Sequence, residues 1–219
     1  EEKIKSLGIP VRKEFAKKVS KEEARKELGL EEDTFYLLVS AGSMGAGGIV
    51  KTIKLLYRWC KKKNKKLEKK RKNENENQRQ TKLIIICGNN KVLYETLQKI
   101  VGDDDCVILT GFTNQMALYL KASDVCITKP GGLSSTEAAV ANIPFIHAMA
   151  IPGCETRNLE FFESCGMSIG VKKTKGQLIR IQGKELCETM KLAQRKFVRP
   201  DSGMAICRLT EKMVRNVNL

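Results

Sequence analysis

The chain has 219 residues, of which 40 are basic and 25 acidic, so its formal net charge is +15, and 42% of its residues are apolar. No apolar run approaches the roughly 18 residues of a membrane-spanning helix, and the charged start of the chain is unlike a secretory signal peptide. These features argue against an integral membrane protein and against a secreted one. Because the sequence does not begin with methionine, we expect it to be a piece of a longer protein.

The eight cysteines form no CxxC pair, and the chain has a single histidine. Cys87, Cys106 and Cys126 lie in or beside apolar, strand-like runs, where a thiol packs as a small hydrophobic group. We therefore expect no zinc site and no other metal, and the pattern favours a reducing cytosol.

Short apolar runs alternate with helical segments along most of the chain. Ser20 and Glu23 have capping-box spacing at the start of the first helix, and Thr34–Ser40 is a nearly continuous apolar run, typical of a strand covered on both faces. The alternation predicts an α/β fold with one doubly wound, Rossmann-like parallel sheet, in which ligands bind at the carboxyl ends of the strands. The predicted strands are 34–40, 82–87, 106–110, 124–128, 144–147 and 167–171, and the predicted helices are 20–28, one from about 49, 91–101, 114–122, 133–141, 155–165, 183–193 and 205–217.

The positive charge is concentrated between Lys51 and Lys82, which hold 14 basic residues against 3 acidic ones. Lys61–Lys72 reads KKKNKKLEKKRK and is followed by a polar, low-complexity stretch, so we expect an exposed helix end that leads into a flexible loop. Three interpretations stay open: a neutral solvated extension, attraction to an anionic membrane surface, and nucleic-acid binding. The last is the least favoured, because the run has no interleaved aromatic residue to stack on bases.

The turn after the first strand, residues 41–48, is rich in glycine. Glycines let backbone N–H groups approach an anion, and the following helix offers the positive end of its dipole. The turn matches neither the GxGxxG fingerprint nor the P-loop. By itself it is consistent with a phosphate cradle and equally with a tight turn.

The turn after the fourth strand, residues 128–137, carries more information. Pro130-Gly131-Gly132 ends the strand and opens a helix, and Glu137 lies one turn further on, where its carboxylate could accept both hydroxyls of a ribose. The alternative is that Ser134 caps the helix and Glu137 supports that cap. With the first turn, this second anion-binding helix start favours a nucleoside diphosphate as the ligand.

Three further groups have weaker signals. In the turn of residues 150–158, Glu155, Arg157 and Asn158 suit sugar hydroxyls, whereas Cys154 has no base nearby in sequence and is not expected to be a nucleophile. The lone His147 ends a strand and is expected to be a packed or rim residue. The acidic run 103–105 precedes a strand and is expected to form a surface turn.

Five segments in this order resemble glycosyltransferase family 28: residues 8–12 (GIPVR), 42–45 (GSMG), 111–116 (GFTNQM), 129–137 (KPGGLSSTE) and 152–158 (PGCETRN). The chain is similar to the C-terminal, nucleotide-sugar-binding half of a two-domain GT-B enzyme. Within the family it is most similar to monogalactosyldiacylglycerol synthases and processive diacylglycerol glucosyltransferases. The peptidoglycan enzyme that adds GlcNAc to a lipid-linked precursor is a more distant relative.

The resemblance implies a role for each matching residue. Arg12 would lie near the donor phosphates, Glu137 would hold the ribose, and Glu155 and Asn158 would face the donor sugar. The family commonly has Gln where this chain has Cys154, a sugar contact, so the identity of the sugar stays open among glucose, galactose and GlcNAc. The remaining implied donor contacts are Ser43, Met44 and Gly45 at the diphosphate, Phe112, Thr113 and Met116 at the uracil, and Gly131, Gly132, Leu133 and Ser134 at the phosphate.

The implied reaction is inverting transfer of a hexose from a UDP-α-sugar to a lipid hydroxyl such as that of diacylglycerol. Helix N-termini and Arg12 would stabilise the departing diphosphate without an obligatory metal or cofactor. The general base and the lipid acceptor site belong to the N-terminal domain in this family, so we expect this piece to bind donor without turnover, at the cytoplasmic face of a membrane. The partners expected are UDP-sugar, a lipid acceptor and an anionic membrane surface contacted through Lys61–Lys72, with no nucleic acid.

The expected division of the chain is a linker at 1–19, a donor-nucleotide-binding domain at 20–200 with a basic, flexible insertion at 61–80, and a C-terminal helix at 201–219. Two alternatives to the lipid hexosyltransferase remain. One is another UDP-GlcNAc-dependent GT-B enzyme, either the peptidoglycan-precursor GlcNAc transferase or a UDP-sugar 2-epimerase. The other is a non-catalytic module that docks on membranes.

Overall fold

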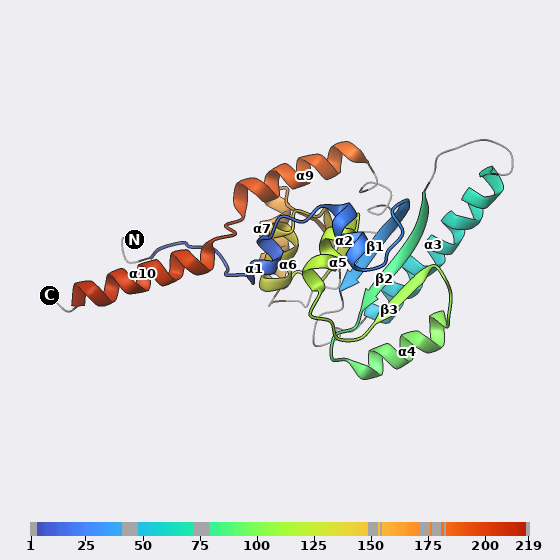
Figure 1. Cartoon of the computed structure of the whole chain (residues 1–219), viewed down its shortest axis with the longest axis horizontal. Helices are drawn as coiled ribbons and strands as arrows, with labels where there is room; N and C mark the ends of the chain where they lie inside the picture. Colours follow the sequence, from blue (N-terminus) through green and yellow to red (C-terminus); the bar gives the residue numbers. More distant parts are fainter. Residues whose placement is uncertain are drawn as a thin grey trace.

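A parallel sheet forms the centre of the molecule (Figure 1). The computed structural model describes residues 4–40, 48–71, 79–148, 153, 155–170, 176, 181 and 183–217. Within these residues the sheet has six strands in the order β3-β2-β1-β4-β5-β6. The strands are β1 (Thr34–Ser40), β2 (Gln80–Ile86), β3 (Val107–Thr110), β4 (Val125–Thr128), β5 (Phe145–His147) and β6 (Ile169–Gly170).

Helices cover both faces of this sheet, because alternate residues of each strand point to opposite sides. In β1, Leu37 and Val39 join one buried cluster, whereas Tyr36 and Leu38 join the other. The first cluster packs against α3 and α4, and the second against α1, α5, α6 and α7. The helices are α1 (Lys13–Ala16), α2 (Lys21–Glu27), α3 (Ile49–Arg71), α4 (Lys91–Val101), α5 (Met116–Ala122), α6 (Gly132–Val140), α7 (Thr156–Ser164), α9 (Lys184–Phe197) and α10 (Ser202–Val217).

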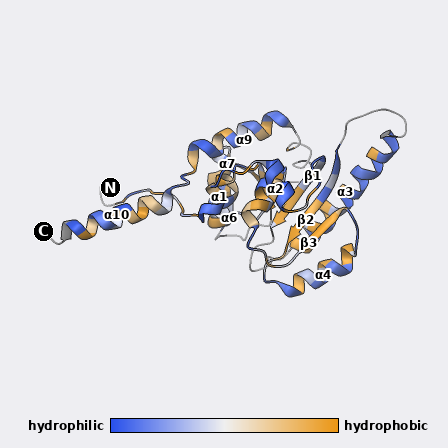
Figure 2. Ribbon diagram, viewed as in Figure 1, coloured by the Kyte–Doolittle hydropathy of each residue, from blue (hydrophilic) through white to orange (hydrophobic). Residues whose placement is uncertain are grey.

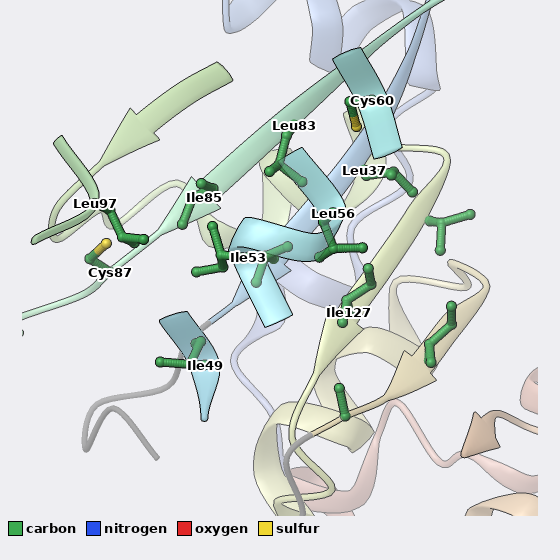
Figure 3. Packing of buried hydrophobic residues seen from close by; sticks show 14 of the residues in the cluster. Leu37, Ile49, Ile53, Leu56, Cys60, Leu83, Ile85, Cys87, Leu97 and Ile127 are labelled. Atoms are coloured by element: carbon green, nitrogen blue, oxygen red, sulfur yellow. The ribbon is translucent and has the colours of Figure 1, made fainter. Parts of the chain in front are cut away.

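Helix α3 is attached to the sheet along one side only. Ile53, Leu56 and Cys60 are fully buried and pack against residues of the central strands (Figure 3). Further along the helix, the buried amide of Asn64 pairs with the backbone of Thr81: Nδ2 donates to its carbonyl and Oδ1 accepts from its N–H, both at 2.9 Å. This pairing holds the basic half of the helix to the start of β2.

A buried ion pair fixes α2 to the sheet. Arg25, 3% exposed, places Nη2 at 2.8 Å from Oδ2 of Asp124, and the same carboxylate oxygen accepts from the N–H of Tyr36. The Arg25 side chain also donates to the carbonyl of Ala122 and lies over the Tyr36 ring. Each polar atom of this pair is thus satisfied, as buried charges require.

The N-terminal segment lies beside the start of α10, and α10 extends away from the sheet (Figure 1). Arg199 Nη1 donates to the carbonyl of Ser6 at 2.6 Å. Gly8 has φ = +84°, and a Cβ atom there would collide with the hydroxyl of Ser202. Glycine at position 8 therefore lets the N-terminal segment run against the start of α10.

The alternating strands and helices and the parallel sheet confirm the fold expected from the sequence. Several boundaries differ: the short helix α1 was not predicted, β2 begins at Gln80 instead of 82, β6 is limited to Ile169–Gly170, α9 extends to Phe197 and α10 begins at Ser202. Residues 61–71 continue α3, which confirms the exposed helix end expected there. Residues 72–78 lie outside the described part of the chain. Among the described helices, none combines the length and apolar character needed to cross a bilayer.

Candidate functional site

The order of the strands reverses between β1 and β4, which pair in parallel at the centre of the sheet. At such a switch point the connections that follow the two strands leave on opposite sides and open a crevice at the carboxyl edge, where α/β sheets bind ligands. The turn after β1 falls mostly outside the described residues. The turn after β4, which leads into α6, is therefore where the site can be built atom by atom.

The first turn of α6 presents unpaired backbone donors. Gly131 is the N-cap residue, and the first intrahelical bond runs from the N–H of Ser135 to its carbonyl at 2.9 Å. Among the described residues, no acceptor faces the N–H groups of Gly132, Leu133 and Ser134, and the Ser134 hydroxyl makes no hydrogen bond. The alternative that Ser134 caps this helix is therefore wrong. The helix start is open and carries the positive end of the dipole toward the crevice.

A buried histidine holds α6 in place from behind. His147, at the end of β5, lies with Nε2 at 2.8 Å from Ser135 Oγ and Nδ1 at 3.0 Å from the hydroxyl of Ser168. The ring packs edge-on against Phe145 and Phe162. Burial lowers the pKa of His147 to about 4, and the charge of Glu155 only partly opposes this. The imidazole is neutral at pH 7 and structural, as the sequence suggested.

Glu137 and Arg12 approach each other on the open side of α6. Glu137 Oε1 lies 3.9 Å from Arg12 Nη2, and the exposed fractions of the two side chains are 15% and 58%. Burial raises the pKa of Glu137, whereas the charge of Arg12 lowers it. The arrangement places an acceptor carboxylate beside a guanidinium that is accessible to an anion.

Lys129 was not among the residues predicted for the site, yet it lies at the helix start. Its ammonium is 2.8 Å from Glu155 Oε1, and both side chains are largely buried. The Lys129 side chain also passes 3.7 Å from the position that a Cβ of Gly131 would occupy. In the sequence, Lys129 is marked as the single cation between a buried strand and Pro-Gly-Gly. In the structure, its ammonium lies near the open N–H groups while it pairs with Glu155.

The loop before α6 is held by Asn158, whose Nδ2 donates to the carbonyl of Pro130 at 3.0 Å. The N-terminal segment also reaches the helix, since Ile9 Cδ1 lies 3.5 Å from where a Cβ of Gly132 would stand. The structure thus brings together around one helix start most of the residues predicted for phosphate, ribose and sugar. These are Arg12, Gly131, Gly132, Leu133, Ser134, Glu137, Glu155 and Asn158.

The residues predicted to read the base lie elsewhere on the same edge of the sheet. Phe112 follows β3, is 70% exposed and lines a hollow of about 790 Å³ with Gly88, Lys91 and Tyr94. Thr113 Oγ1 accepts from the N–H of Gln115, and Met116 begins α5. Two strands separate β3 from β4, which is roughly 14 Å at about 4.8 Å for each step. Phe112 and Thr113 therefore follow a strand well removed from the one that leads into α6, whereas Met116 packs against the buried cluster to which α6 contributes.

Four of the predicted donor contacts, Ser43, Met44, Gly45 and Cys154, lie outside the described residues. The acidic run is a turn, as expected, and Asp104 in it accepts from Lys61 and from the Tyr57 hydroxyl. Within the described part of the chain, no group of three metal-ligating side chains comes together.

Comparisons with known proteins agree with this architecture. The family model described as "Glycosyltransferase family 28 C-terminal domain" matches residues 36–152. The chain is 30% identical over 193 residues to a processive diacylglycerol beta-glucosyltransferase of Bacillus pumilus, and 29% identical over 210 residues to monogalactosyldiacylglycerol synthase 2, chloroplastic, of Arabidopsis thaliana. These alignments cover 86% and 92% of this chain but 46% and 42% of the relatives, so the chain spans about half their length.

Solved structures share the fold at low sequence identity. Acinetobacter baumannii MurG superposes with a TM-score of 0.58 at 17% identity, covering 90% of this chain and 55% of that one. The S. aureus MnaA-UDP co-structure gives 0.63 at 16% identity, covering 91% and 50%. In each case, this chain corresponds to about half of the other protein.

Proposed function

Because this chain belongs to glycosyltransferase family 28 through its C-terminal domain, we propose that it binds the UDP-sugar donor of an inverting hexosyltransferase. The acceptor is a lipid hydroxyl such as that of diacylglycerol, the substrate class named for its relatives from Bacillus pumilus and Arabidopsis. The acceptor site and the general base lie in a part of the whole protein outside this chain. The whole enzyme works at the cytoplasmic face of a membrane, where its acceptor resides.

One observation carries the proposal: the open start of α6. Three consecutive N–H groups, which find no acceptor among the described residues, lie at the positive end of a helix dipole and at the switch point of the sheet. Together they would form a site for an anion of diphosphate size. Lys129 and Arg12 add positive charge on either side. A carboxylate one turn away, on Glu137, is the acceptor that two ribose hydroxyls need.

The same groups explain how the donor bond would break. Negative charge builds up on the β-phosphate oxygens as the bond to the sugar carbon lengthens. The α6 N–H groups would face that charge without reorganisation, and Arg12 and Lys129, each beside a carboxylate, would lie close to it. Glu155 and Asn158, positioned by Lys129 and by the Pro130 carbonyl, would face the hexose.

The first test is calorimetric titration of the chain with UDP. We expect measurable binding that Glu137→Gln weakens by roughly ten- to a hundredfold, because hydrogen bonds to a charged group contribute about 1.5–3 kcal/mol. The matched control is Glu211→Gln, an exposed carboxylate on α10. Equal affinities for the chain and both variants would contradict the ribose role, and no binding of UDP by the chain would contradict the donor site.

Parallel titrations with UDP-glucose, UDP-galactose and UDP-GlcNAc then rank the donors. A preference for UDP-GlcNAc would favour the GlcNAc transferase or epimerase alternatives. A preference for either hexose would support the lipid hexosyltransferase. Release of a 2-epimerised sugar by the whole protein, without a lipid acceptor, would identify an epimerase instead.

A further inference from the structure

Six basic residues form a straight stripe along the outer side of α3: Lys51, Lys54, Arg58, Lys62, Lys65 and Lys69. At about 100° per residue they fall within about 80° of the helix circumference, and at about 1.5 Å per residue they extend over roughly 27 Å. We call this stripe the α3 ridge. Figure 2 shows hydrophilic residues dominating the far end of this helix.

The ridge stands opposite the side of α3 that is buried. Ile53, Leu56 and Cys60 on the inner side are fully buried, and Leu67 is 5% exposed. All six ridge residues are exposed. The packed side and the Asn64–Thr81 hydrogen bonds therefore fix a rigid support, so the cations are presented together and not on a freely moving chain.

Within the described residues, no ridge cation forms an ion pair, although Glu68, Asp104 and Asp105 line a hollow with Arg58, Lys62 and Lys65. Lys61, which pairs with Asp104 at 2.5 Å, lies beside the ridge and not in it. Glu68 lies outside the ridge, about 40° around the helix from its edge at Lys54. The ridge also places like charges three and four residues apart, as at Lys54, Arg58 and Lys62, and such pairs destabilise a helix slightly. Folding alone gives no reason for this arrangement.

We propose that the α3 ridge docks the protein on an anionic lipid surface. A straight row of cations on a rigid helix matches a flat sheet of negative headgroups, and each cation near such a surface strengthens binding. Leu55 is 41% exposed and lies on the same side of the helix, where it can enter the headgroup layer. The choice of a lipid over other polyanions rests on the proposed function, whose acceptor is a lipid.

The aromatic residues of this helix disfavour nucleic acid. The hydroxyl of Tyr57 donates to Asp104 at 2.8 Å, and the Trp59 ring lies 5.2 Å from the ammonium of Lys63. Both residues are partly buried against the core, which leaves each ring with less surface for stacking on a base. Helix α3 begins at Ile49, just after the turn that follows β1, so the ridge starts at the edge of the sheet that carries the site. Docking through it would hold that edge within one helix length of the lipid.

The test is co-sedimentation of the 219-residue chain with vesicles of phosphatidylcholine alone or with phosphatidylglycerol as about a third of the lipid. Two variants carry the same change in net charge, four basic residues replaced by glutamine, which keeps helix propensity. The ridge variant replaces Lys54, Arg58, Lys62 and Lys65. The control variant replaces the exposed lysines Lys18, Lys26, Lys184 and Lys212.

We expect binding only to the vesicles with phosphatidylglycerol, weakening as NaCl rises from about 0.05 to about 0.5 M. The ridge variant should lose roughly a hundredfold or more in vesicle affinity, and the control variant much less. The ridge variant should unfold at the same temperature or higher, because like-charge repulsion is removed, and bind UDP normally. Normal UDP binding separates failure of the docking proposal from failure of the donor site.

Three outcomes would overturn the proposal. In the first, both kinds of vesicle bind equally well or not at all. In the second, the ridge and control variants lose the same affinity, which would mean that only net charge matters. In the third, the chain binds single-stranded oligo(dT) more tightly than anionic vesicles and the ridge variant loses that binding, which would assign the ridge to nucleic acid.

Discussion

Helices α4 and α6 both follow strands of the same sheet at its carboxyl edge, yet they begin in opposite ways. At α4 the side chain of Asn90 accepts from the N–H of Leu93 at 2.9 Å, so the helix start is closed by its own sequence. At α6 the cap residue is Gly131, and nothing in the described chain closes the start. The difference teaches that a helix satisfied by its own cap serves the fold, whereas one left open at a switch point is free for a ligand.

An open start removes one source of stability, and α6 is held by other means. Ser135, in the first turn, bonds to the neutral ring of His147, and Thr136 Oγ1 donates to the Gly132 carbonyl at 2.7 Å. The helix is therefore anchored through its body, which leaves its first N–H groups exposed to the crevice. Three changes test this contrast.

The largest effect is expected on the free energy of unfolding when the pH is lowered. The pKa of His147 is about 4 in the folded chain, below its ordinary value of about 6.5, so the unfolded state takes up the proton first. The stability due to this ring is complete above pH 6.5 and is lost as the pH falls from 6.5 to 4, by about 3 kcal/mol in all. Urea unfolding across this range measures the loss.

His147→Gln is the control, because the chain has no other histidine. The variant should be less stable at pH 7 and should show a smaller loss between pH 6.5 and 4. If the chain and the variant lost the same stability between pH 6.5 and 4, His147 would not be a neutral, buried residue that anchors α6.

The second-largest effect is expected, on UDP affinity, when a side chain is added that caps the start of α6. Gly131 has φ −75° and ψ 137°, which asparagine adopts easily, and the atoms around its missing Cβ stand at 3.7 Å or more. In Gly131→Asn the side-chain amide oxygen would accept a hydrogen bond from the N–H of Ser134, just as Asn90 accepts from Leu93 at α4. We expect UDP affinity to fall by roughly tenfold, about 1.4 kcal/mol, while the free energy of unfolding stays level or rises by a few tenths of a kcal/mol. Unchanged UDP affinity would show that the open start is not the phosphate site.

The reciprocal change at α4 should have the smallest effect. Asn90→Ala removes the cap and is expected to cost about 1 kcal/mol of stability in chemical denaturation. The affinity for UDP should not change, because the side chain of Asn90 caps α4 and does not line the hollow beside Phe112. A drop in UDP affinity as large as that of Gly131→Asn would remove the distinction between the two helices.

The sequence predicted the sheet well because its strands are short, nearly continuous apolar runs separated by glycine-containing turns. The residues Gly131–Glu137 were also found from sequence, since Pro-Gly-Gly before a run of hydroxyls indicates an open helix start. The sequence does not show whether Ser134 caps the helix or leaves its start open, because both arrangements use the same residues. Only the position of its hydroxyl relative to the backbone separates them.

Other features depend on contacts between distant residues. The ion pair between Lys129 and Glu155 joins residues 26 positions apart, so no local pattern shows it. The basic run was expected to be an exposed helix end, but its composition does not reveal what holds it to the sheet: Asn64 pairs with the backbone of Thr81, and Leu67 is buried. One buried residue in every three or four is enough to hold a helix whose other residues are charged.

The two sides of α3 have consequences for how this protein can change over time. Positions that pack against the sheet and positions that carry the ridge are different residues of the same helix, and the ridge residues make no ion pair within the described chain. Substitutions in the ridge can therefore accumulate at almost no cost in folding, whereas those on the inner side are removed by selection for stability. The surface charge of this helix is therefore free to change, one lysine at a time, while the core remains unchanged.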